Sequence, residues 1–526
     1  MYDRILKNGR IMDGTGKPSY EGDIAIRDGR IEEVAPSIHE AAHEVVNLHG
    51  LAVAPGFIDN HSHSDTVFLE DDRCEGKLLQ GVTSEVSGQC GSTIYPCPLD
   101  GMERLKEYAD AYAPFASSSL REFTEKLQKN GIQMGTNQIP LIGHGALRVG
   151  VMGYENRPAT EEELSLMARL LREQMEYGAW GMSLGLGYTP GISSNQTELD
   201  TLGAVVAEYG GVVHSHMRYQ NERTPEALEE MFHIARASGV RVNISHFKAG
   251  GKSAFGMAPY FAELVHRAQR EGIRVSADVY PYTASSSGIT NSFPKWSIQG
   301  GISHAVAAVQ GERRQEILDF LAERFSTKEE GEGYIIVNTA GTFPQADGCT
   351  LWEVSQKMGL SMAETMAELT VRSNGKAWCI GFGMSEEDVA VMLAQNDFAI
   401  GSDGSAFPFD EKKSGGKQHP RNYATFPRFL RLVREQEFCT MEQAVARITR
   451  RPCEINDIRD RGLLQEGRIA DITVFDPDTI TDCNTFKNPC IKPKGILHVL
   501  MEGQFAVRDG EQTDQRLGKI LRKPQK

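Results

Sequence analysis

The pattern of apolar and polar positions changes twice along the chain. Residues 1–50 alternate apolar and polar side chains between NG and DG turns, as in "DIAIRDGRIEEV", and this predicts β-hairpins. The same alternation returns near the other end, for example in "GILHVLMEGQFAVRDG". We therefore expect residues 1–54 and 462–510 to form one composite β-sandwich.

Between these two segments, eight short apolar runs alternate with amphipathic helices. One helix has clear ends, because Thr160 and Glu163 form a capping box before "LSLMARLLREQMEYG" and Gly178 stops it. Eight strands that alternate with helices favour a parallel (βα)8 TIM-like barrel, an α/β fold, over an open sheet. The predicted strands are 52–58, 81–86, 138–143, 179–184, 211–215, 241–245, 273–278 and 397–401.

The gap between the seventh and eighth predicted strands, at about 280–396, is too long for a single crossover helix. We expect an insertion at about 289–345 that covers the barrel mouth as a lid. The barrel then spans residues 55–461, and residues 511–526 form a C-terminal tail.

Composition narrows the class of protein. The formal charge of −15 over 526 residues argues against nucleic acid or an anionic membrane as a partner. The start "MYDRILKNGR" lacks the apolar segment of a secretory signal, and no apolar run approaches the roughly 18–20 residues that span a bilayer. Nine scattered cysteines without a CxxC motif predict free thiols in a reducing cytoplasm.

Metal-binding side chains recur where the predicted strands end, which is where (βα)8 barrels carry their chemistry. His61 and His63 are two residues apart in an extended segment, so both imidazoles point the same way. Each member alone has an ordinary explanation as a core histidine, a packed cysteine or a turn aspartate. Together they match the imidazole and thiolate ligands that zinc prefers. The set is His61, His63, Cys90, His216, His246 and Asp403.

Two further histidines lie near strand ends. His214 is expected to be a satisfied core residue beside His216. His144, in "GHGALR", either lines the mouth or orders a loop, and the sequence leaves both open.

At this point the chain resembles a known family. "PGFIDNHSHSD", "GVTSEVSGQCG", "GHGALR", "HSHMR", "ISHFK", "DVYPYTAS", "GSDG" and "HPRNYATFPRFL" resemble the motifs of the amidohydrolase superfamily, and within it those of the N-acyl-D-amino acid deacylases (D-aminoacylases). The motifs run in the family's order over nearly the whole chain. Cys90 carries the finer assignment, since this group uses a cysteine where most of the superfamily bridges its metals with a carboxylated lysine or a glutamate.

The resemblance implies roles for the strand-end residues. Cys90, His216 and His246 would hold one tight Zn²⁺. His61 and His63, with Cys90 bridging, would form a second and weaker site. A metal-bound hydroxide would attack the amide, and Asp403 would act as general acid/base.

The resemblance also implies a carboxylate-binding group made of Lys248, Tyr282 and Arg421, with Tyr188 and either Ser286 or Ser287 as further substrate contacts. The sequence does not tell the two serines apart, and Ser287 stands for the pair among the candidate contacts. The sequence differs from the family's motifs in two places near these substrate-binding residues. The segment from Asp403 to Arg421 is longer than the family's usual loop, and "ASSSG" replaces the more usual Ala-Gly-Ser pattern.

The expected function is hydrolysis of N-acyl-D-amino acids, small molecules, to a carboxylate and a free D-amino acid. A hydantoinase-like or dihydroorotase-like enzyme acting on a cyclic amide is the alternative. That alternative expects a bridging lysine after the third or fourth strand, and the sequence offers no clear candidate. An inactive scaffold of the same fold predicts loss of the metal ligands, which are all present. The side chain of the D-residue, the acyl group and the oligomeric state stay open.

Overall fold

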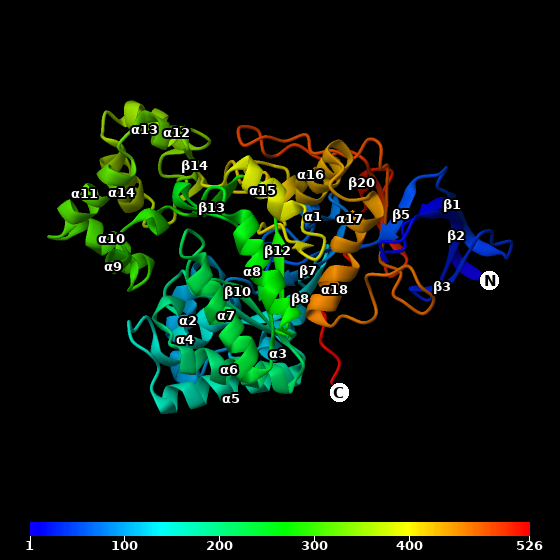
Figure 1. Ribbon diagram of the computed structural model, residues 1–526, viewed down its shortest axis with the longest axis horizontal. Coiled ribbons are helices and arrows are strands. Elements are labelled where there is room, and N and C mark those ends of the chain that lie inside the picture. The colour runs from blue at the N-terminus through cyan, green and yellow to red at the C-terminus, as the bar shows by residue number, and fades with distance from the viewer. Residues whose placement is uncertain (526) are drawn as a thin grey trace.

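Eight parallel strands form a barrel at the centre of the molecule (Figure 1). The computed structural model describes residues 1–525. Hydrogen bonds from Asn60 N to Ile400 O (3.3 Å) and from His63 N to Gly404 O (2.9 Å) join the first strand to the last. The predicted (βα)8 fold is confirmed. The barrel strands are β6 (Phe57–Asp59), β7 (Val82–Ser87), β8 (Asn137–Gly143), β9 (Gly181–Gly185), β10 (Val212–His216), β11 (Arg241–Ile244), β12 (Val275–Val279) and β16 (Ala399–Ile400).

Helices surround this barrel and bury their apolar faces against it. Thr160 and Glu163 form the predicted capping box, and Gly178 ends the same helix in a left-handed conformation with φ 115°. The helices outside the insertion are α1 (Glu75–Leu78), α2 (Met102–Ala109), α3 (Leu120–Lys129), α4 (His144–Met152), α5 (Glu161–Tyr177), α6 (Gln196–Glu208), α7 (Thr224–Ser238), α8 (Ala258–Arg270), α15 (Glu386–Leu393), α16 (Arg421–Gln436), α17 (Met441–Arg447) and α18 (Arg450–Asn456).

The predicted strand 52–58 is wrong as one strand. Its first half, β5 (Ala52–Pro55), pairs with strands of an outer sheet, and its second half is β6 of the barrel. The chain changes sheets at Gly56, where a Cβ atom would lie 2.3 Å from the Thr83 hydroxyl. The close approach of the two sheets therefore requires glycine at this position.

The outer sheet has nine strands and draws them from both ends of the chain. The order is β20-β19-β18-β17-β5-β1-β2-β3, with β4 beside β1, so the N-terminal β5 pairs with the C-terminal β17. The strands are β1 (Tyr2–Ile11), β2 (Tyr20–Arg27), β3 (Arg30–Ala35), β4 (Ala42–Asn47), β17 (Ile472–Phe475), β18 (Ile496–Met501), β19 (Gln504–Arg508) and β20 (Glu511–Gln512).

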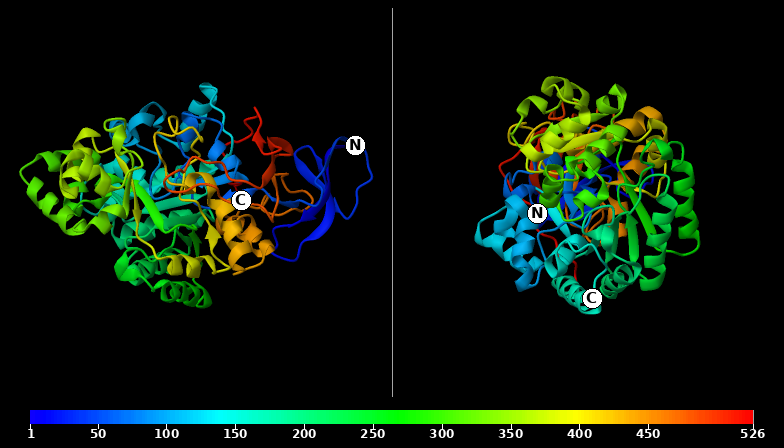
Figure 2. Two further views of the ribbon diagram at one scale, coloured as in Figure 1. Left: turned by 90° about the horizontal axis from the view of Figure 1, so that it is seen from above. Right: turned by 90° about the vertical axis from the view of Figure 1, so that its left-hand side faces the viewer.

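A separate group of elements lies between β12 and β16, at the end of the molecule opposite the outer sheet (Figures 1 and 2). We call residues 284–382 the insertion. It contains a three-stranded antiparallel sheet in the order β13-β15-β14 and its own apolar cluster. Its elements are β13 (Ala284–Gly288), α9 (Lys295–Ile298), α10 (Ile302–Gln310), α11 (Arg314–Arg324), α12 (Lys328–Glu332), β14 (Tyr334–Asn338), α13 (Leu351–Met358), α14 (Met362–Arg372) and β15 (Trp378–Phe382).

The C-terminal tail runs along the barrel. Leu521 N donates to Gln138 O, and the indole of Trp180 donates to Leu521 O, which ties the tail to the starts of β8 and β9. Among residues 1–525, no helix has both the length and the apolar character needed to cross a membrane.

Candidate metal centre

Potential metal ligands meet at the carboxyl end of the barrel. Donor atoms of His61, Cys90, His246 and Asp403 all lie within 4.8 Å of one another. His216, the last residue of β10, places Nδ1 3.8 Å from the Cys90 Sγ and 2.9 Å from the His246 Nε2. These residues follow five different strands and come together only because the barrel aligns the strand ends.

The spacing of the donors fits a metal ion. The Cys90 Sγ lies 3.5 Å from the Nε2 atoms of both His61 and His246. Ligand atoms around a tetrahedral zinc ion, with bonds of about 2.0–2.3 Å, lie roughly 3.3–3.8 Å apart. The three separations that involve the Cys90 Sγ therefore match a ligand set, whereas the 2.9 Å between His216 Nδ1 and His246 Nε2 is shorter.

Backbone strain is concentrated at this site. Cys90, His246 and Asp403 have φ values of 54°, 38° and 52°. Left-handed conformations are uncommon for residues other than glycine and cluster at functional sites. Around Cys90, the neighbouring Gly88 is also left-handed, and a Cβ there would lie 2.5 Å from the Leu141 carbonyl oxygen. The turn after β7 thus directs the thiol toward the histidines.

A buried polar network supports the ligands from below. The fully buried Lys77 ammonium donates to Asp59 Oδ2 and Ser402 Oγ, both at 2.6 Å. Asp59 Oδ1 in turn accepts from the backbone N–H groups of His61 (3.1 Å) and Ser402 (2.8 Å). The network holds the end of β6 against the end of β16, and it thereby sets the distance between the first histidines and Asp403.

Asp403 is held in its ionised form. Burial would raise the pKa of this carboxyl, but the charge of Arg421 and the neighbouring histidines hold it well below its usual range. Arg421 Nη1 lies 2.8 Å from Oδ2, and His63 Nε2 lies 3.1 Å from Oδ1. A carboxylate that is ionised and faces the cluster can accept a proton.

Three of the histidines are neutral, which is the form that binds metals. Burial lowers the pKa of His216 to about 3 and moves those of His61 and His246 well below the ordinary value. Burial also opposes charge on His63, yet its hydrogen bonds with Asp403 and Cys90 raise its pKa to about 10. Among the described residues His61 Nδ1 has no hydrogen-bond partner, and it lies 3.8 Å from Asp278 Oδ1.

The cluster forms the floor of a cavity of about 750 Å³ between the barrel mouth and the insertion. Tyr188 lines it, with its ring centred 4.3 Å from that of His216. Ser286 and Ser287 both line it as well, but the Ser286 hydroxyl donates to Cys379 O at 3.2 Å. Among residues 1–525 the Ser287 hydroxyl has no hydrogen bond within the protein, so it is the freer of the two for a ligand.

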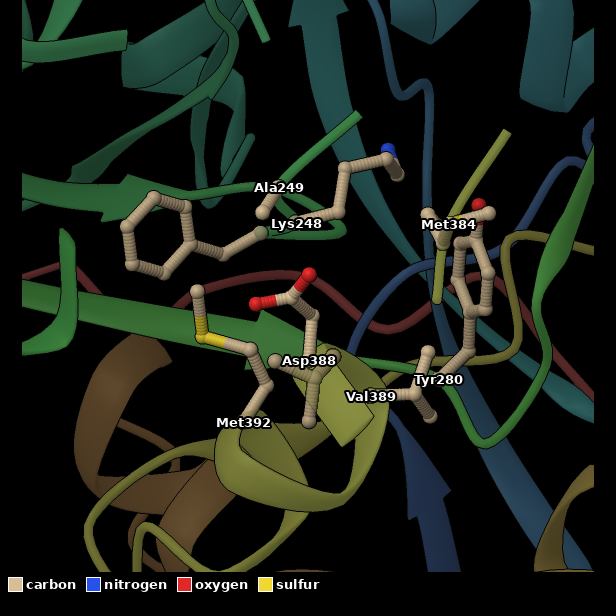
Figure 3. Close-up of a pocket in the computed structure, with 9 residues that line it drawn as sticks. Lys248, Ala249, Tyr280, Met384, Asp388, Val389 and Met392 are labelled. Carbon is tan, nitrogen blue, oxygen red and sulfur yellow. The ribbon is translucent and has the colours of Figure 1, made fainter. Parts of the chain in front are cut away.

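Lys248 and Arg421 also line the cavity near the metal ligands. The Lys248 Nζ donates to Gln220 Oε1 at 2.6 Å and lies 2.9 Å from His246 Nδ1, and burial lowers its pKa to about 8. Figure 3 shows the amine of Lys248 and the hydroxyl of Tyr280 at the same side of a small void, which Asp388, Val389 and Met392 of α15 close from the other side. The start of α15 therefore packs behind Lys248.

The sequence of the chain matches known proteins over nearly its whole length. The family described as "Amidohydrolase family" matches residues 44–318 and 397–507. The chain belongs to the amidohydrolase family. Among curated relatives, the D-aminoacylase and the N-acyl-D-glutamate deacylase of Alcaligenes xylosoxydans xylosoxydans are each 32% identical to it. The alignments cover 99% of this chain and 97% and 96% of those proteins.

A solved structure agrees with this assignment. The N-acyl-D-glutamate deacylase of Bordetella bronchiseptica, complexed with zinc and a phosphonate inhibitor, superposes with a TM-score of 0.83 at 30% identity over 99% of each chain. An L-hydantoinase from Arthrobacter aurescens shares the fold at 15% identity and a TM-score of 0.59. The resemblance to the deacylases is thus confirmed, and the amidohydrolase has the metal-binding cluster expected of an enzyme of this family.

The structure places one predicted substrate contact of the amidohydrolase elsewhere. Tyr282 does not line the cavity: it is 2% exposed and packs against His419 and Phe486. Tyr280, two residues earlier, lies nearer the site, with its ring centre 5.3 Å from the Arg421 guanidinium and 5.4 Å from the Lys248 Nζ. Tyr280 and Tyr282 are two residues apart, so an extended chain would point both side chains the same way. They differ because β12 ends at Val279 and the chain turns there, which the sequence did not reveal.

His144 and His214, the two further histidines near strand ends, are buried outside the cavity. His144 bonds Glu198 at 2.6 Å beside Arg148, so it orders the loop rather than lining the mouth. His214 is a satisfied core residue as predicted, with the Asn456 side chain at 2.9 Å on one ring nitrogen and those of Gln89 and Asn243 at 3.2 Å on the other. Sequence reasoning missed Lys77, and the one signal was a lysine inside the apolar run "GKLLQGV".

Proposed function

We propose that this amidohydrolase is a zinc-dependent N-acyl-D-amino acid deacylase. The observation that carries the proposal is the thiol of Cys90 amid histidine nitrogens, with Asp403 at the same point. The relatives named D-aminoacylase and N-acyl-D-glutamate deacylase support the linear amide as substrate. A thiolate with imidazoles is a donor set that suits zinc better than magnesium or calcium.

Cys90, His216 and His246 would hold the tight ion, and His61 and His63 would contribute to a second site that Cys90 bridges. When bound, zinc polarises the acyl carbonyl and makes a water molecule nucleophilic near neutral pH. The neutral imidazoles, kept so by burial, are ready to bind without losing a proton.

In this proposal Asp403 first accepts a proton and then donates it. Arg421 holds the pKa of Asp403 low and so keeps its carboxylate ionised, and this carboxylate would accept a proton from the attacking water. It then delivers that proton to the departing nitrogen, which makes the amine a competent leaving group. General acid–base help of this kind typically contributes about 10²–10⁴-fold in rate.

Lys248 and Arg421 are proposed to bind the substrate's α-carboxylate. Both line the cavity beside the cluster. Within residues 1–525, Arg421 Nη1 has no well-directed hydrogen bond, although it lies 2.8 Å from Asp403 Oδ2. A substrate carboxylate offers these donors charged partners. Anchored there, an N-acyl amino acid of one configuration turns its amide toward the metal. Tyr188 and Ser287, which line the cavity, complete the proposed substrate contacts. Tyr280 packs beside Lys248 and Arg421 behind the lining and would help to hold them in place.

The cyclic-amide alternative finds less support in the cavity. Within residues 1–525, Lys248 is the lysine that lines it, and Lys248 follows β11 rather than the third or fourth strand. Under the proposal, the thiol of Cys90 would take the place of that lysine among the metal ligands.

The test is an assay of purified protein with its zinc content measured in parallel. We expect bound zinc, hydrolysis of N-acetyl-D-amino acids, and little turnover of the N-acetyl-L-amino acids or of hydantoin. Protein that binds zinc yet opens hydantoin faster than it cleaves any N-acetyl-D-amino acid would overturn the proposal.

A further inference from the structure

The cations that line the cavity all lie at its metal end. Within residues 1–525, Lys248 and Arg421 are the only lysine and arginine among the lining residues. Lys248 is engaged by Gln220 and His246, and Arg421 by Asp403. Under the proposed function these two cations receive the α-carboxylate of the substrate, and the lining His63 is held by Asp403 at 3.1 Å, so no lining cation remains for a second carboxylate.

The wall facing them is built by the insertion and carries no charge. β13 contributes Ser285 and Ser287, the turn after it contributes Asn291, and β14 and β15 contribute Asn338 and Trp378. Within residues 1–525 the side chains of Ser285, Ser287 and Asn291 make no hydrogen bond, so their donors and acceptors are available to a ligand. We call these five residues the insertion wall.

Two cations near this region are already paired with acids. Lys376, just before β15, forms an ion pair with Asp110 at 2.8 Å. Arg428 of α16 forms one with Asp482 at 2.9 Å and also donates to Pro281 O at 2.6 Å. Neither lines the cavity. Freeing either one for a substrate anion would leave a carboxylate without its counter-charge.

Resting on the proposed function, we propose that this enzyme selects N-acyl-D-amino acids whose side chain is uncharged and forms hydrogen bonds, such as an amide, and that the insertion wall reads that side chain. An acidic side chain would lose part of its hydration in the cavity without gaining a cation. An aliphatic side chain would leave the hydroxyl and amide groups of the wall without partners. The relatives do not decide this point, because those acting on different D-residues are equally similar to the chain.

The first test compares nearly isosteric substrates under zinc-saturating conditions. We expect kcat/KM for N-acetyl-D-glutamine to exceed that for N-acetyl-D-glutamate by about 100-fold and that for N-acetyl-D-methionine by about 10-fold. Equal or faster turnover of the glutamate or the methionine substrate overturns the inference. Absence of turnover with every N-acetyl-D-amino acid would instead count against the proposed function itself, so the two failures are distinguishable.

The second test adds the missing charge. Asn338→Lys, and independently Asn291→Lys, should shift the glutamate-to-glutamine ratio of kcat/KM by about 10-fold or more toward glutamate. Gln315→Lys is the matched control: it makes the same charge change on an exposed face of α11, in the insertion but outside the cavity, and should leave the ratio unchanged. If both wall variants fold and bind zinc but keep the original ratio, the insertion wall does not read the side chain.

Discussion

The two ends of the cavity are built in different ways. The metal end is made of strand termini of the barrel, is buried, and is crossed by ion pairs such as Lys77–Asp59 and Arg421–Asp403. The insertion wall is half-exposed, uncharged, and carried by a small sheet outside the barrel. The family match covers the proposed metal ligands and also Ser285, Ser287 and Asn291 of the insertion wall, but it omits residues 319–396, which include Asn338 and Trp378. The difference suggests that the barrel supplies the chemistry and the insertion supplies the choice of substrate.

Asp403→Asn, at the metal end, should cause the largest loss of activity. The amide cannot take the proton from water, so we expect kcat to fall by about 10³-fold or more for every substrate alike. Zinc content measured by elemental analysis should stay near that of the wild type. Wild-type turnover by the variant would show that proton transfer lies elsewhere.

Cys90→Ala should have the next largest effect, because it removes the thiolate at the centre of the ligand set. We expect the zinc content to fall sharply and kcat to drop by about 100-fold or more at ordinary zinc concentration. Cys453→Ala is the control, since Cys453 is a buried core thiol away from the cavity. Retention of stoichiometric zinc by Cys90→Ala would contradict the ligand assignment.

Lys77→Met tests whether the metal end depends on its buried support. Removing the ammonium leaves Asp59 buried without its partner, so the free energy of unfolding should fall by about 3 kcal/mol and zinc affinity should weaken. Denaturant titration and zinc titration measure the two effects. Lys106→Met, which breaks an exposed pair with Glu103, should change neither. Unaltered zinc affinity in Lys77→Met would mean that the network stabilises the fold without positioning the ligands.

Trp378→Ala should have the smallest effect and should act on substrate choice. Trp378 is 47% exposed at the start of β15 and lines the cavity, so its loss removes apolar contact with a bulky substrate. We expect kcat/KM to fall a few-fold to about 10-fold for large substrates and little for N-acetyl-D-alanine, with zinc content unchanged. Phe382→Ala, an exposed aromatic on the same strand outside the cavity, is the control. Equal losses for large and small substrates would argue against a role in selection.

The parts of the fold that follow local rules were predictable from the sequence. Alternation between strands and capped helices predicted the barrel, and the strand ends predicted the cluster around Cys90. The predictions that failed concern features that depend on tertiary structure. The run 52–58 is apolar throughout, so nothing local reveals that it changes sheets at Gly56. Tyr280 and Tyr282 differ only in the direction that the chain takes after β12.

Arg421 illustrates a second limit. Its motif predicted a residue for the substrate carboxylate, and the structure places it 2.8 Å from Asp403, where it also sets the charge of that carboxylate. A pairing between residues of one cavity depends on the path of the intervening loop, which the sequence does not encode in any short pattern. The insertion wall was unpredictable for the same reason.

The pairing of β5 with β17 has a consequence for synthesis of the protein on the ribosome. Ala52 lies opposite Phe475, so about 420 residues must be synthesised before the edge of β5 finds its partner. At translation rates of about 5–20 residues per second, that edge waits roughly 20–80 s. All four residues of β5 are buried in the finished sheet, so even with β1 on its other side the nascent chain carries an apolar strand with one unpaired edge throughout this interval. A ribosome that stalls late would release an aggregation-prone fragment, and shielding of this segment by a chaperone would protect the growing chain.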